Sequence, residues 1–284
     1  MIHSHEGQFK VRMMCGVRRV SPSGYYGWRS SGPSAREQAR TALDTQVAAA
    51  FAVEKGRAGS PRLHRQLKAL GSRVGRHQVA RSLRRQGLRA KGARKYKATT
   101  NSNHDLPVAP NLLQQDFSAM RPNQKWVCDI TYIGTDEGWL YLAVVLDLYS
   151  RTVVGWSMSE RMPATLACDA LKMAIFKRHR PKGVIVHSDR GSQYCSHEHR
   201  QLLNEHGLIC SMSKKGDCFD NAAMESWNHS LKVEAIHGER FKTRDEAKQQ
   251  VFDYIEVYYN RQRLHSTLGY LSPLRFEQVY AKVS

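Results

Sequence analysis

The sequence has few of the features that mark membrane, secreted or zinc-binding proteins. Among its 284 residues no apolar run approaches the roughly 18 that a membrane span needs; the longest are Val47–Val53 and Leu140–Leu148. The polar start, Met1–Lys10, is not expected of a signal peptide. The six cysteines form no Cys-x-x-Cys pair, and none of the 13 histidines completes a zinc-finger spacing. We therefore expect a cytoplasmic protein with reduced cysteines and no membrane partner.

Acidic residues are scarce in the amino-terminal part of the chain. The whole sequence carries 44 Lys and Arg against 25 Asp and Glu, a net charge of +19. Residues 1–120 account for +16 of this charge, and residues 121–284 for only +3. Between Lys55 and Lys97 there are 15 basic residues and no acidic residue. Such clustering predicts a polyanionic partner, with nucleic acid as the first choice and an anionic membrane as the second.

The first 89 residues are predicted to be helical and to contain a small DNA-binding domain. Residues 1–54 form a helical or irregular region, rich in Ser, Gly and Arg at first and helical in pattern over 35–53. Residues 55–89 follow as a separate domain, in which a helix begins at Ser60-Pro61 and ends at Gly71. The expected inner face of this helix consists of Leu63, Leu67 and Leu70.

A second helix of this domain is predicted from about His77 to Gln86, with Val79 and Leu83 facing inward. Its outward basic residues, which we expect to bind DNA, are Arg81, Arg84 and Arg85. Two short helices joined by a tight turn resemble a helix-turn-helix. The alternative is a helical hairpin with a solvated basic face. The absence of interspersed acids favours DNA binding.

Residues 90–120 are predicted to be a linker. They show no periodicity and contain Gly92, Pro107 and Pro110. The first part is basic and is expected to follow a phosphate backbone. The basic residues of this segment are Lys91, Arg94, Lys95 and Lys97.

Residues 121–284 have the pattern of a mixed α/β domain with a carboxyl-terminal helix. Three consecutive strands are predicted first, and helices and strands then alternate. The expected strands are 126–133, 139–148, 152–158, 183–187 and 208–212. The expected helices are 164–177, 196–205, 222–236 and 244–260.

Three acidic residues of this domain stand where strands end or helices begin. Asp129 lies in the first strand on the face of Val127 and Thr131, opposite Trp126 and Cys128. Asp189 follows a buried apolar strand, in the place where α/β sheets hold ligands. Glu225 lies in the first turns of a helix. Taken singly, each carboxylate has an ordinary alternative as a solvated surface charge.

The helical spacing places Glu225 on one face with Asn228, His229 and Lys232, opposite the packing residues Ala223, Trp227 and Leu231. A glutamate and a lysine on one face would set a metal ligand beside a phosphate contact. Three carboxylates in a basic protein suggest metal-assisted phosphoryl transfer, since Mg²⁺ prefers carboxylate oxygens, water and phosphate. Two such ions about 4 Å apart activate the attacking oxygen and stabilise the leaving oxygen.

These residues lie in motifs that closely resemble the transposases of bacterial insertion sequences, within the integrase-like DDE superfamily. The resemblance is closest to the second-reading-frame product of the insertion sequence three family. The motifs are Trp126–Tyr132, His187–Tyr194, Asp220–Trp227, Leu231–Lys232 with Glu234, Tyr259–His265, Leu268–Tyr270 and Pro273. Between Asp189 and Glu225 lie 35 residues, and Lys232 follows the glutamate by seven, both as in the family.

The resemblance implies an RNase H-like core, a mixed five-stranded sheet with flanking helices, behind the basic all-α domain. It implies that Asp129, Asp189 and Glu225 are catalytic and bind two Mg²⁺ ions, with Mn²⁺ as a substitute. Water would nick DNA at the inverted-repeat ends of the element, and the 3′-OH would then attack target DNA. Lys232 would contact the terminal DNA. Supporting roles are expected for His187, Asn221, Asn228 and His229.

The family also implies partners: double-stranded DNA, at least one further copy of the chain, and an upstream-frame helix-turn-helix protein. The expected location is the bacterial cytoplasm, in association with the nucleoid. Two alternatives stay open. The chain is a DNA-binding accessory or regulatory subunit, inactive unless fused or complexed with the upstream-frame product, or an RNase H-like nuclease without strand transfer. It is either the lone second-frame product or a self-sufficient variant.

Overall fold

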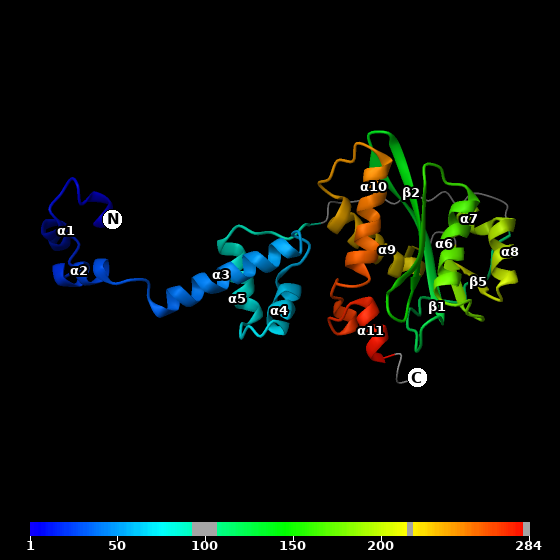
Figure 1. Ribbon diagram of the computed structural model, residues 1–284, viewed down its shortest axis with the longest axis horizontal. Helices are drawn as coiled ribbons and strands as arrows, with labels where there is room; N and C mark the ends of the chain where they lie inside the picture. The colour runs from blue at the N-terminus through cyan, green and yellow to red at the C-terminus, as the bar shows by residue number, and fades with distance from the viewer. Residues whose placement is uncertain (93–106, 215–217, 281–284) are drawn as a thin grey trace. The chain divides into compact units, whose positions relative to one another are not determined.

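The computed structural model describes residues 1–92, 107–214 and 218–280. The chain divides into two compact units, Met1–Ala90 and Lys91–Ser284 (Figure 1). No helix in the described residues is long and apolar enough to cross a membrane. Cys15, Cys128, Cys168, Cys195 and Cys210 are free thiols, and all of these except Cys210 are buried.

The first unit is helical and its helices begin at sequence signals. Its elements are η1 (His3–His5), α1 (Val11–Val17), α2 (Pro22–Ser30), α3 (Ala35–Val53), α4 (Ser60–Ala69) and α5 (Arg76–Arg85). Helix α2 forms within the Ser-, Gly- and Arg-rich stretch, because the Ser21 side chain accepts from the Gly24 N–H and Pro22 occupies the first turn. Ser34 caps α3 in the same way, through the Glu37 N–H.

Helices α3, α4 and α5 share one hydrophobic core. Its buried members are Val47, Ala58, Leu63, Leu67, Val79 and Leu83. The predicted inner faces are thus confirmed except at Leu70, which caps the end of α4 and is 80% exposed. The expected boundary between residues 54 and 55 runs through this core, because Val47 belongs to α3. Sequence periodicity shows that α3 has an apolar face but not which helices cover it.

The second unit is a mixed five-stranded sheet with flanking helices, as predicted. Its strands are β1 (Lys125–Thr135), β2 (Gly138–Asp147), β3 (Val153–Ser159), β4 (Ile185–Ser188) and β5 (Ile209–Met212). Their order across the sheet is β3-β2-β1-β4-β5. Strands β1, β2 and β3 are antiparallel neighbours, whereas β1, β4 and β5 run parallel.

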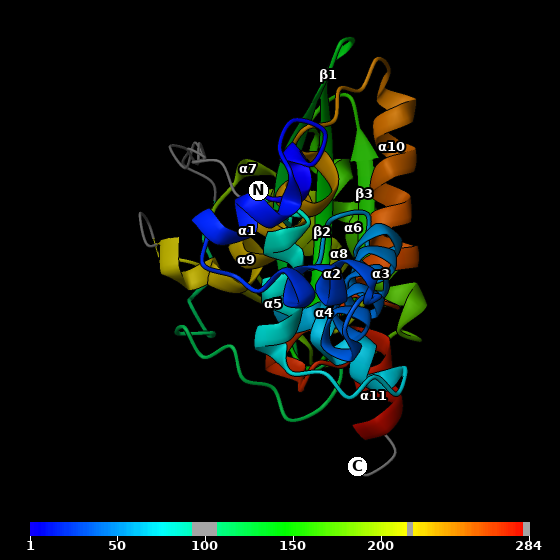
Figure 2. The ribbon, with the colours of Figure 1, turned by 90° about the vertical axis from the view of Figure 1, so that its left-hand side faces the viewer.

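Helices cover both faces of the sheet (Figure 1). Helices α6 (Ala164–Lys177) and α8 (His197–Glu205) pack on one face, and α9 (Ala222–Leu231) and α10 (Arg244–Phe252) on the other. In the view turned by 90°, α10 runs alongside the strands (Figure 2). The remaining helices are α7 (Ser192–Cys195) and α11 (Pro273–Tyr280), with the 3₁₀ turns η2 (Cys218–Asn221) and η5 (Ser266–Leu268).

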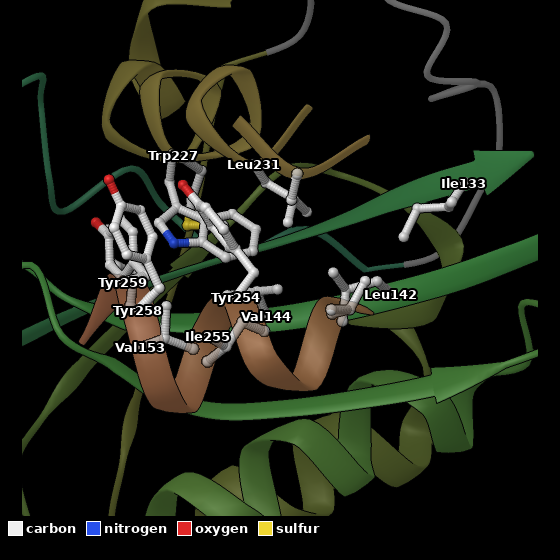
Figure 3. Packing of buried hydrophobic residues seen from close by; sticks show 14 of the residues in the cluster. Ile133, Leu142, Val144, Val153, Trp227, Leu231, Tyr254, Ile255, Tyr258 and Tyr259 are labelled. Atoms are coloured by element: carbon white, nitrogen blue, oxygen red, sulfur yellow. The ribbon is translucent and has the colours of Figure 1, made fainter. Parts of the chain in front are cut away.

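The two long helices predicted over 222–236 and 244–260 each change type before they end. Helix α9 continues as the π-helical turn η3 (Lys232–Ile236), and α10 continues as the π-helical turn η4 (Asp253–Tyr259). Such turns are rare and occur often at functional sites. Both lie on the same face of the sheet (Figure 3).

The alternation in β1 divides the core into two layers. Trp126 and Cys128 point toward α6 and α8, whereas Val127 joins the cluster of α9 and α10. That second cluster contains Trp227, whose ring meets the edge of Tyr259 at a centroid distance of 5.9 Å (Figure 3). The predicted division of the β1 side chains is therefore confirmed, and Asp129 lies on the α9 side.

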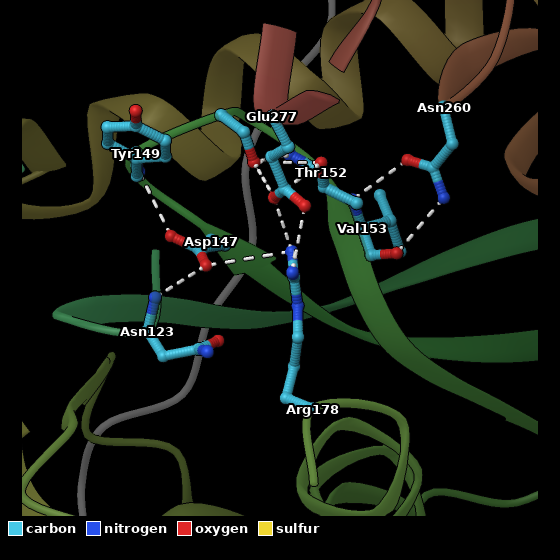
Figure 4. A network of polar contacts seen from close by, with 9 residues as sticks. Asn123, Asp147, Tyr149, Thr152, Val153, Arg178, Asn260 and Glu277 are labelled. Atoms are coloured by element: carbon cyan, nitrogen blue, oxygen red, sulfur yellow. Dashed lines mark hydrogen bonds and ion pairs between the residues drawn. The ribbon is translucent and has the colours of Figure 1, made fainter. Parts of the chain in front are cut away.

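A buried polar network attaches the carboxyl-terminal helix to the sheet (Figure 4). Arg178, at the end of α6, donates to Glu277 of α11 at 2.8 Å and lies 3.7 Å from the carboxylate of Asp147. Although burial opposes it, the hydrogen bonds and charge of Arg178 hold the pKa of Glu277 below its usual value. Asn260 bonds both the N–H and the C=O of Val153, at 2.9 and 3.0 Å.

We expect Arg178→Ala to lower the free energy of unfolding by about 3 kcal/mol, because it leaves the carboxylates of Asp147 and Glu277 buried without their cation. Urea unfolding at pH 7 measures this change. The matched control is Lys177→Ala, since the Lys177 side chain is exposed and its ion pair with the half-buried Glu256 should contribute under about 1 kcal/mol. Equal destabilisation by the two substitutions would contradict a structural role of the buried pair.

Candidate active site

Two aspartates lie beside each other where β1 and β4 run in parallel. The strands pair with a constant offset, in which Val127 is opposite His187. Continued two residues past the last paired residues, this offset sets Asp129 opposite Asp189, which follows the last β4 residue, Ser188, and the charge of Asp189 acts on Asp129. Neighbouring strands are about 4.8 Å apart, so this register makes the two aspartates neighbours. The structure therefore brings the first two predicted site residues together.

Asp129 accepts two hydrogen bonds, and its pKa is shifted. Its Oδ2 accepts from Asn228 Nδ2 at 2.6 Å, and its Oδ1 accepts from the Ile130 N–H at 2.8 Å. Burial, followed by the charge of Asp189, raises the pKa of Asp129 to about 7, although the hydrogen bonds and Lys232 oppose the shift. A cation between the carboxylates would relieve the repulsion, because opposite charge favours the ionised form.

The turn after β4 orients Asp189. The Gly191 N–H donates to Asp189 Oδ1 at 2.9 Å. A Cβ at position 191 would lie 3.0 Å from that oxygen and 3.2 Å from Gln193 Oε1. A glycine at position 191 therefore leaves room for the Asp189 carboxylate to accept a hydrogen bond from the Gly191 N–H.

Helix α9 is attached to β1 on both sides of Glu225. Asn221, at the start of the helix, donates from Nδ2 to the Cys128 carbonyl at 3.2 Å, and Asn228 donates to Asp129. Both asparagines were predicted as supporting residues, and the structure places them beside the aspartates. On the opposite face Trp227 and Leu231 are buried, as the helical spacing predicted.

Glu225 stands apart from the two aspartates. It is exposed on α9, one turn before Asn228. Within the part of the chain that the structure describes, no three Asp, Glu, His or Cys side chains are close enough to hold one metal ion. Like charges repel one another, and this repulsion is weaker where water screens it. The structure thus joins two of the three predicted acids and sets the third on the adjacent helix.

The atoms around the aspartates nevertheless fit a hard divalent cation. The Oδ1 atoms of Asn221 and Asn228 are buried and accept no hydrogen bond within the described residues. Buried acceptors without donors are costly, and a hydrated cation would supply donors through its water. Mg²⁺ takes a few carboxylate oxygens together with water and phosphate. Asp129, Asp189 and, after a side-chain rotation, Glu225 are the residues that could bind it.

Lys232 is at the far end of the predicted α9 face. Its Nζ lies 5.0 Å from the centroid of the Tyr132 ring, and its side chain is half-buried. Burial lowers the pKa of Lys232, while Tyr132 and Asp129 oppose the shift. An ammonium group beside the aspartates is suited to a DNA phosphate.

The two predicted supporting histidines have different surroundings. His187 is buried; its Nδ1 lies 2.8 Å from Ser211 Oγ on β5, and burial lowers its pKa although the charge of Asp220 opposes this. It therefore links β4, β5 and the turn before α9. His229 is exposed on the outer face of α9.

The predicted DNA-binding arginines of α5 are not equivalent. Arg81 and Arg84 are exposed. Arg85 is also exposed, but it pairs with Asp44 of α3, through Nε at 3.2 Å, and Ser82 donates to the same carboxylate. The hydrogen bond from Arg85 lowers the pKa of Asp44 against its burial. The pattern of charges along the chain cannot identify this pair, because the two residues are 41 positions apart.

Of the basic linker residues, Lys91 alone lies in the described part of the chain. Its Nζ is 3.0 Å from Glu239 Oε1. Arg94, Lys95 and Lys97 lie outside the described residues. Their DNA-binding role stays a prediction.

We expect alanine at Arg81 or Arg84 to weaken DNA binding and to flatten its salt dependence by about 0.9 in log–log slope for each phosphate that the variant no longer neutralises. Alanine at Arg85 should change the slope less, because Asp44 already pairs with its charge, and should lower the free energy of unfolding by about 1 kcal/mol or less. Fluorescence anisotropy at several salt concentrations measures the slopes. Equal slope changes for all three variants would contradict the role assigned to Arg85.

The domains that this geometry defines have known relatives. Family models described as "Integrase core domain" match residues 119–218 and 225–279, and a model described as "HTH-like domain" matches residues 37–96. The protein is therefore an integrase-core protein with a helix-turn-helix-like domain. The HTH-like match includes most of α3, in agreement with the shared core of α3, α4 and α5.

The chain belongs to the IS3 family of transposases. It is 55% identical over 278 residues to the transposase InsF of insertion sequence IS3A from Escherichia coli K12, covering 97% of this chain and 96% of that protein. It is 47% identical to the uncharacterized 31 kDa protein of insertion element IS600 from Shigella sonnei, covering 95% of this chain and all of that protein. Among solved structures, the HTLV-2 integrase catalytic core domain in complex with magnesium matches with a TM-score of 0.41 at 15% identity, covering 56% of this chain and 99% of that chain.

Proposed function

We propose that this transposase cleaves DNA at the inverted-repeat ends of its element and joins the released ends to target DNA, with Mg²⁺ held by Asp129, Asp189 and Glu225. The observation that carries the proposal is the aspartate pair of β1 and β4, whose register and hydrogen bonds hold two carboxylates together despite their repulsion. An integrase core in a chain 55% identical to a transposase supports it.

The proposed reaction has two phosphoryl transfers. In the first, water attacks a phosphodiester at the element end; the P–O3′ bond breaks, and a 3′-OH and a 5′-phosphate result. In the second, this 3′-OH attacks a target phosphodiester, a new P–O bond forms, and the target strand leaves with its own 3′-OH. Mg²⁺ would supply the Lewis acid that lowers the pKa of the attacking group and neutralises the leaving oxygen.

The residues of the chain bind and orient the DNA. Asn221 and Asn228 fix α9 to β1, so that the carboxylates keep their spacing when DNA enters. Lys232 would bind a phosphate close to the cut, where its charge offsets that of the aspartates. The net charge of +16 on residues 1–120 binds DNA without a metal. We further propose that two ends are held by at least two copies of the chain, in the bacterial cytoplasm.

The test is cleavage and joining of a labelled duplex that carries the inverted repeat flanking this gene. Wild type should cut and join in Mg²⁺ but not in EDTA, and Asp189→Asn and Glu225→Gln should bind the duplex without joining it. Asp169→Asn, an exposed acid on α6, is the matched control and should join normally. If wild type binds but never joins, the accessory-subunit alternative holds; if Glu225→Gln joins fully, Glu225 is not catalytic.

A further inference from the structure

Arg263 lies in a buried polar cluster next to the π-helical turn that begins at Lys232. Its Nε donates to Glu234 Oε2 at 2.8 Å, and its Nη2 donates to Glu234 Oε1 at 2.9 Å. The same Nη2 donates to Ser230 Oγ at 3.1 Å. Glu234 is 4% exposed and accepts a further hydrogen bond from the Tyr254 hydroxyl at 3.0 Å.

The residues that Arg263 bonds lie on both sides of Lys232 in the sequence. Ser230 comes two residues before Lys232 and Glu234 two residues after it, so one guanidinium group is bonded to both sides of the lysine. The change from α-helix to π-helix falls at Lys232 itself. A π-turn changes the direction of every later side chain relative to an α-helix. Here the planar guanidinium of Arg263 bonds one residue before the change and one residue after it.

Lys232 in turn approaches the aspartates. Its ammonium lies over Tyr132, three residues along β1 from Asp129. The π-helical turn η4 supplies Tyr254 to the Arg263 cluster. The cluster thus links the carboxyl-terminal segment to the direction of a side chain at the candidate active site.

We propose that Arg263 is a positioning residue for Lys232: with Glu234, Ser230 and Tyr254 it holds the α-to-π transition that directs the Lys232 ammonium to the DNA phosphate. This inference rests on the proposed function of the site. A role in stability alone does not require such geometry, because a buried ion pair contributes little net stability compared with apolar residues of similar volume. Orientation, in contrast, requires the bidentate contact.

The test is a double-mutant cycle on Mg²⁺-dependent joining of the inverted-repeat duplex, with Arg263→Lys, Lys232→Ala and the double variant. Lysine keeps the charge but cannot bond Ser230 and both Glu234 oxygens together. We expect Arg263→Lys to reduce joining about 10- to 100-fold, as for a misplaced catalytic group, and duplex binding to change less than about twofold. The double variant should be no worse than Lys232→Ala, because Arg263 acts through Lys232.

A second readout does not depend on activity. Acetylation of Lys232 by an amine-reactive reagent, followed by mass spectrometry, should be several-fold faster in Arg263→Lys, while other lysines react at unchanged rates. Tyr254→Phe, which removes one hydrogen bond and little volume, should give a smaller change in the same direction. Arg261→Lys is the matched control, since Arg261 is exposed on the same segment and, among the described residues, donates only to a carbonyl, that of Glu256, at 3.0 Å.

Two results would overturn the positioning role. One is a double variant whose loss of joining equals the combined losses of the two single variants. The other is Lys232 labelling that is unchanged in both Arg263→Lys and Tyr254→Phe. If Lys232→Ala joins normally, the role of Lys232 under the proposed function fails. Faster labelling of Lys232 in Arg263→Lys would still show that Arg263 holds the turn that carries Lys232. The two failures are therefore distinguishable.

Discussion

Asp129→Asn is expected to reduce DNA joining by about 10³-fold or more and, at the same time, to stabilise the folded chain. If Asp129 holds Mg²⁺ as proposed, its loss costs several kcal/mol of transition-state stabilisation, and about 4 kcal/mol corresponds to 10³-fold in rate. Asparagine keeps the size of the side chain and can still accept from Asn228. Duplex binding should therefore remain, and the loss should appear in the chemical steps.

The gain in stability follows from the raised pKa of Asp129. Burial and the charge of Asp189 raise this pKa to about 7 in the folded chain, against about 3.9 when unfolded. The folded state therefore binds more protons than the unfolded state between these values, and the stability of wild type falls as the pH rises from about 4 to about 7. Asparagine avoids this loss, so the variant should gain on the order of 2 kcal/mol at pH 8 and little at pH 4.5.

Urea unfolding in EDTA at pH 4.5 and pH 8 measures this difference. Asp169→Asn serves again as the control and should show no pH-dependent gain. An Asp129→Asn variant that gains equally at both pH values would contradict the burial and repulsion inferred for the aspartate pair. A chain that loses activity while it gains stability would show that the charge is kept for function.

Gly155→Ala is expected to destabilise the second unit by at least about 3 kcal/mol or to prevent its folding. Gly155 lies in β3 directly beneath α6. A Cβ at this position would be 2.2 Å from the Ala170 carbonyl oxygen and 2.7 Å from the Ala174 nitrogen. Both are backbone atoms, which cannot rotate away as a flexible side chain can. The whole helix would have to move from the sheet, with loss of the packing of Leu171 and Val154.

Gly134→Ala in β1 is the matched control, because its Cβ would meet only a side-chain atom of Trp139, at 3.5 Å. This variant should change the free energy of unfolding by less than about 0.5 kcal/mol. Urea midpoints and soluble yields of the two variants make the comparison. Equal midpoints would contradict the close approach of α6 to β3.

Much of the fold could be predicted from local signals. The bounds of α3 and α6 agree with the sequence prediction at both ends, because polar caps, turns and apolar periodicity act within a few residues. The alternation of β1 assigned Asp129 to the α9 side. Prediction was poorer where helices change to π-turns, since the side chains that stabilise those turns come from other segments.

The candidate site was predictable in part, because some of its residues follow from local signals in the sequence. Asp189 was expected at the end of a buried strand, and the register of β1 with β4 places it beside Asp129. The position of Glu225 outside this pair was not predictable, because it depends on how α9 packs against a strand that is far away in the sequence. The pairing of Arg85 with Asp44 was likewise hidden, and so was the contact of Arg263 with Glu234, 29 positions away.

The sequence by itself determined that a polycationic amino-terminal half precedes a near-neutral α/β half, and which acids, asparagines and lysine stand on the same strand or helix face. These are properties of composition and of short-range geometry. Only the tertiary structure decided that Arg85 pairs with Asp44, that Arg263 pairs with Glu234, and that Asp129 and Asp189 lie close enough to repel each other. Those outcomes depend on distances between segments far apart in the chain, and charge–charge and hydrogen-bond energies change steeply with such distances.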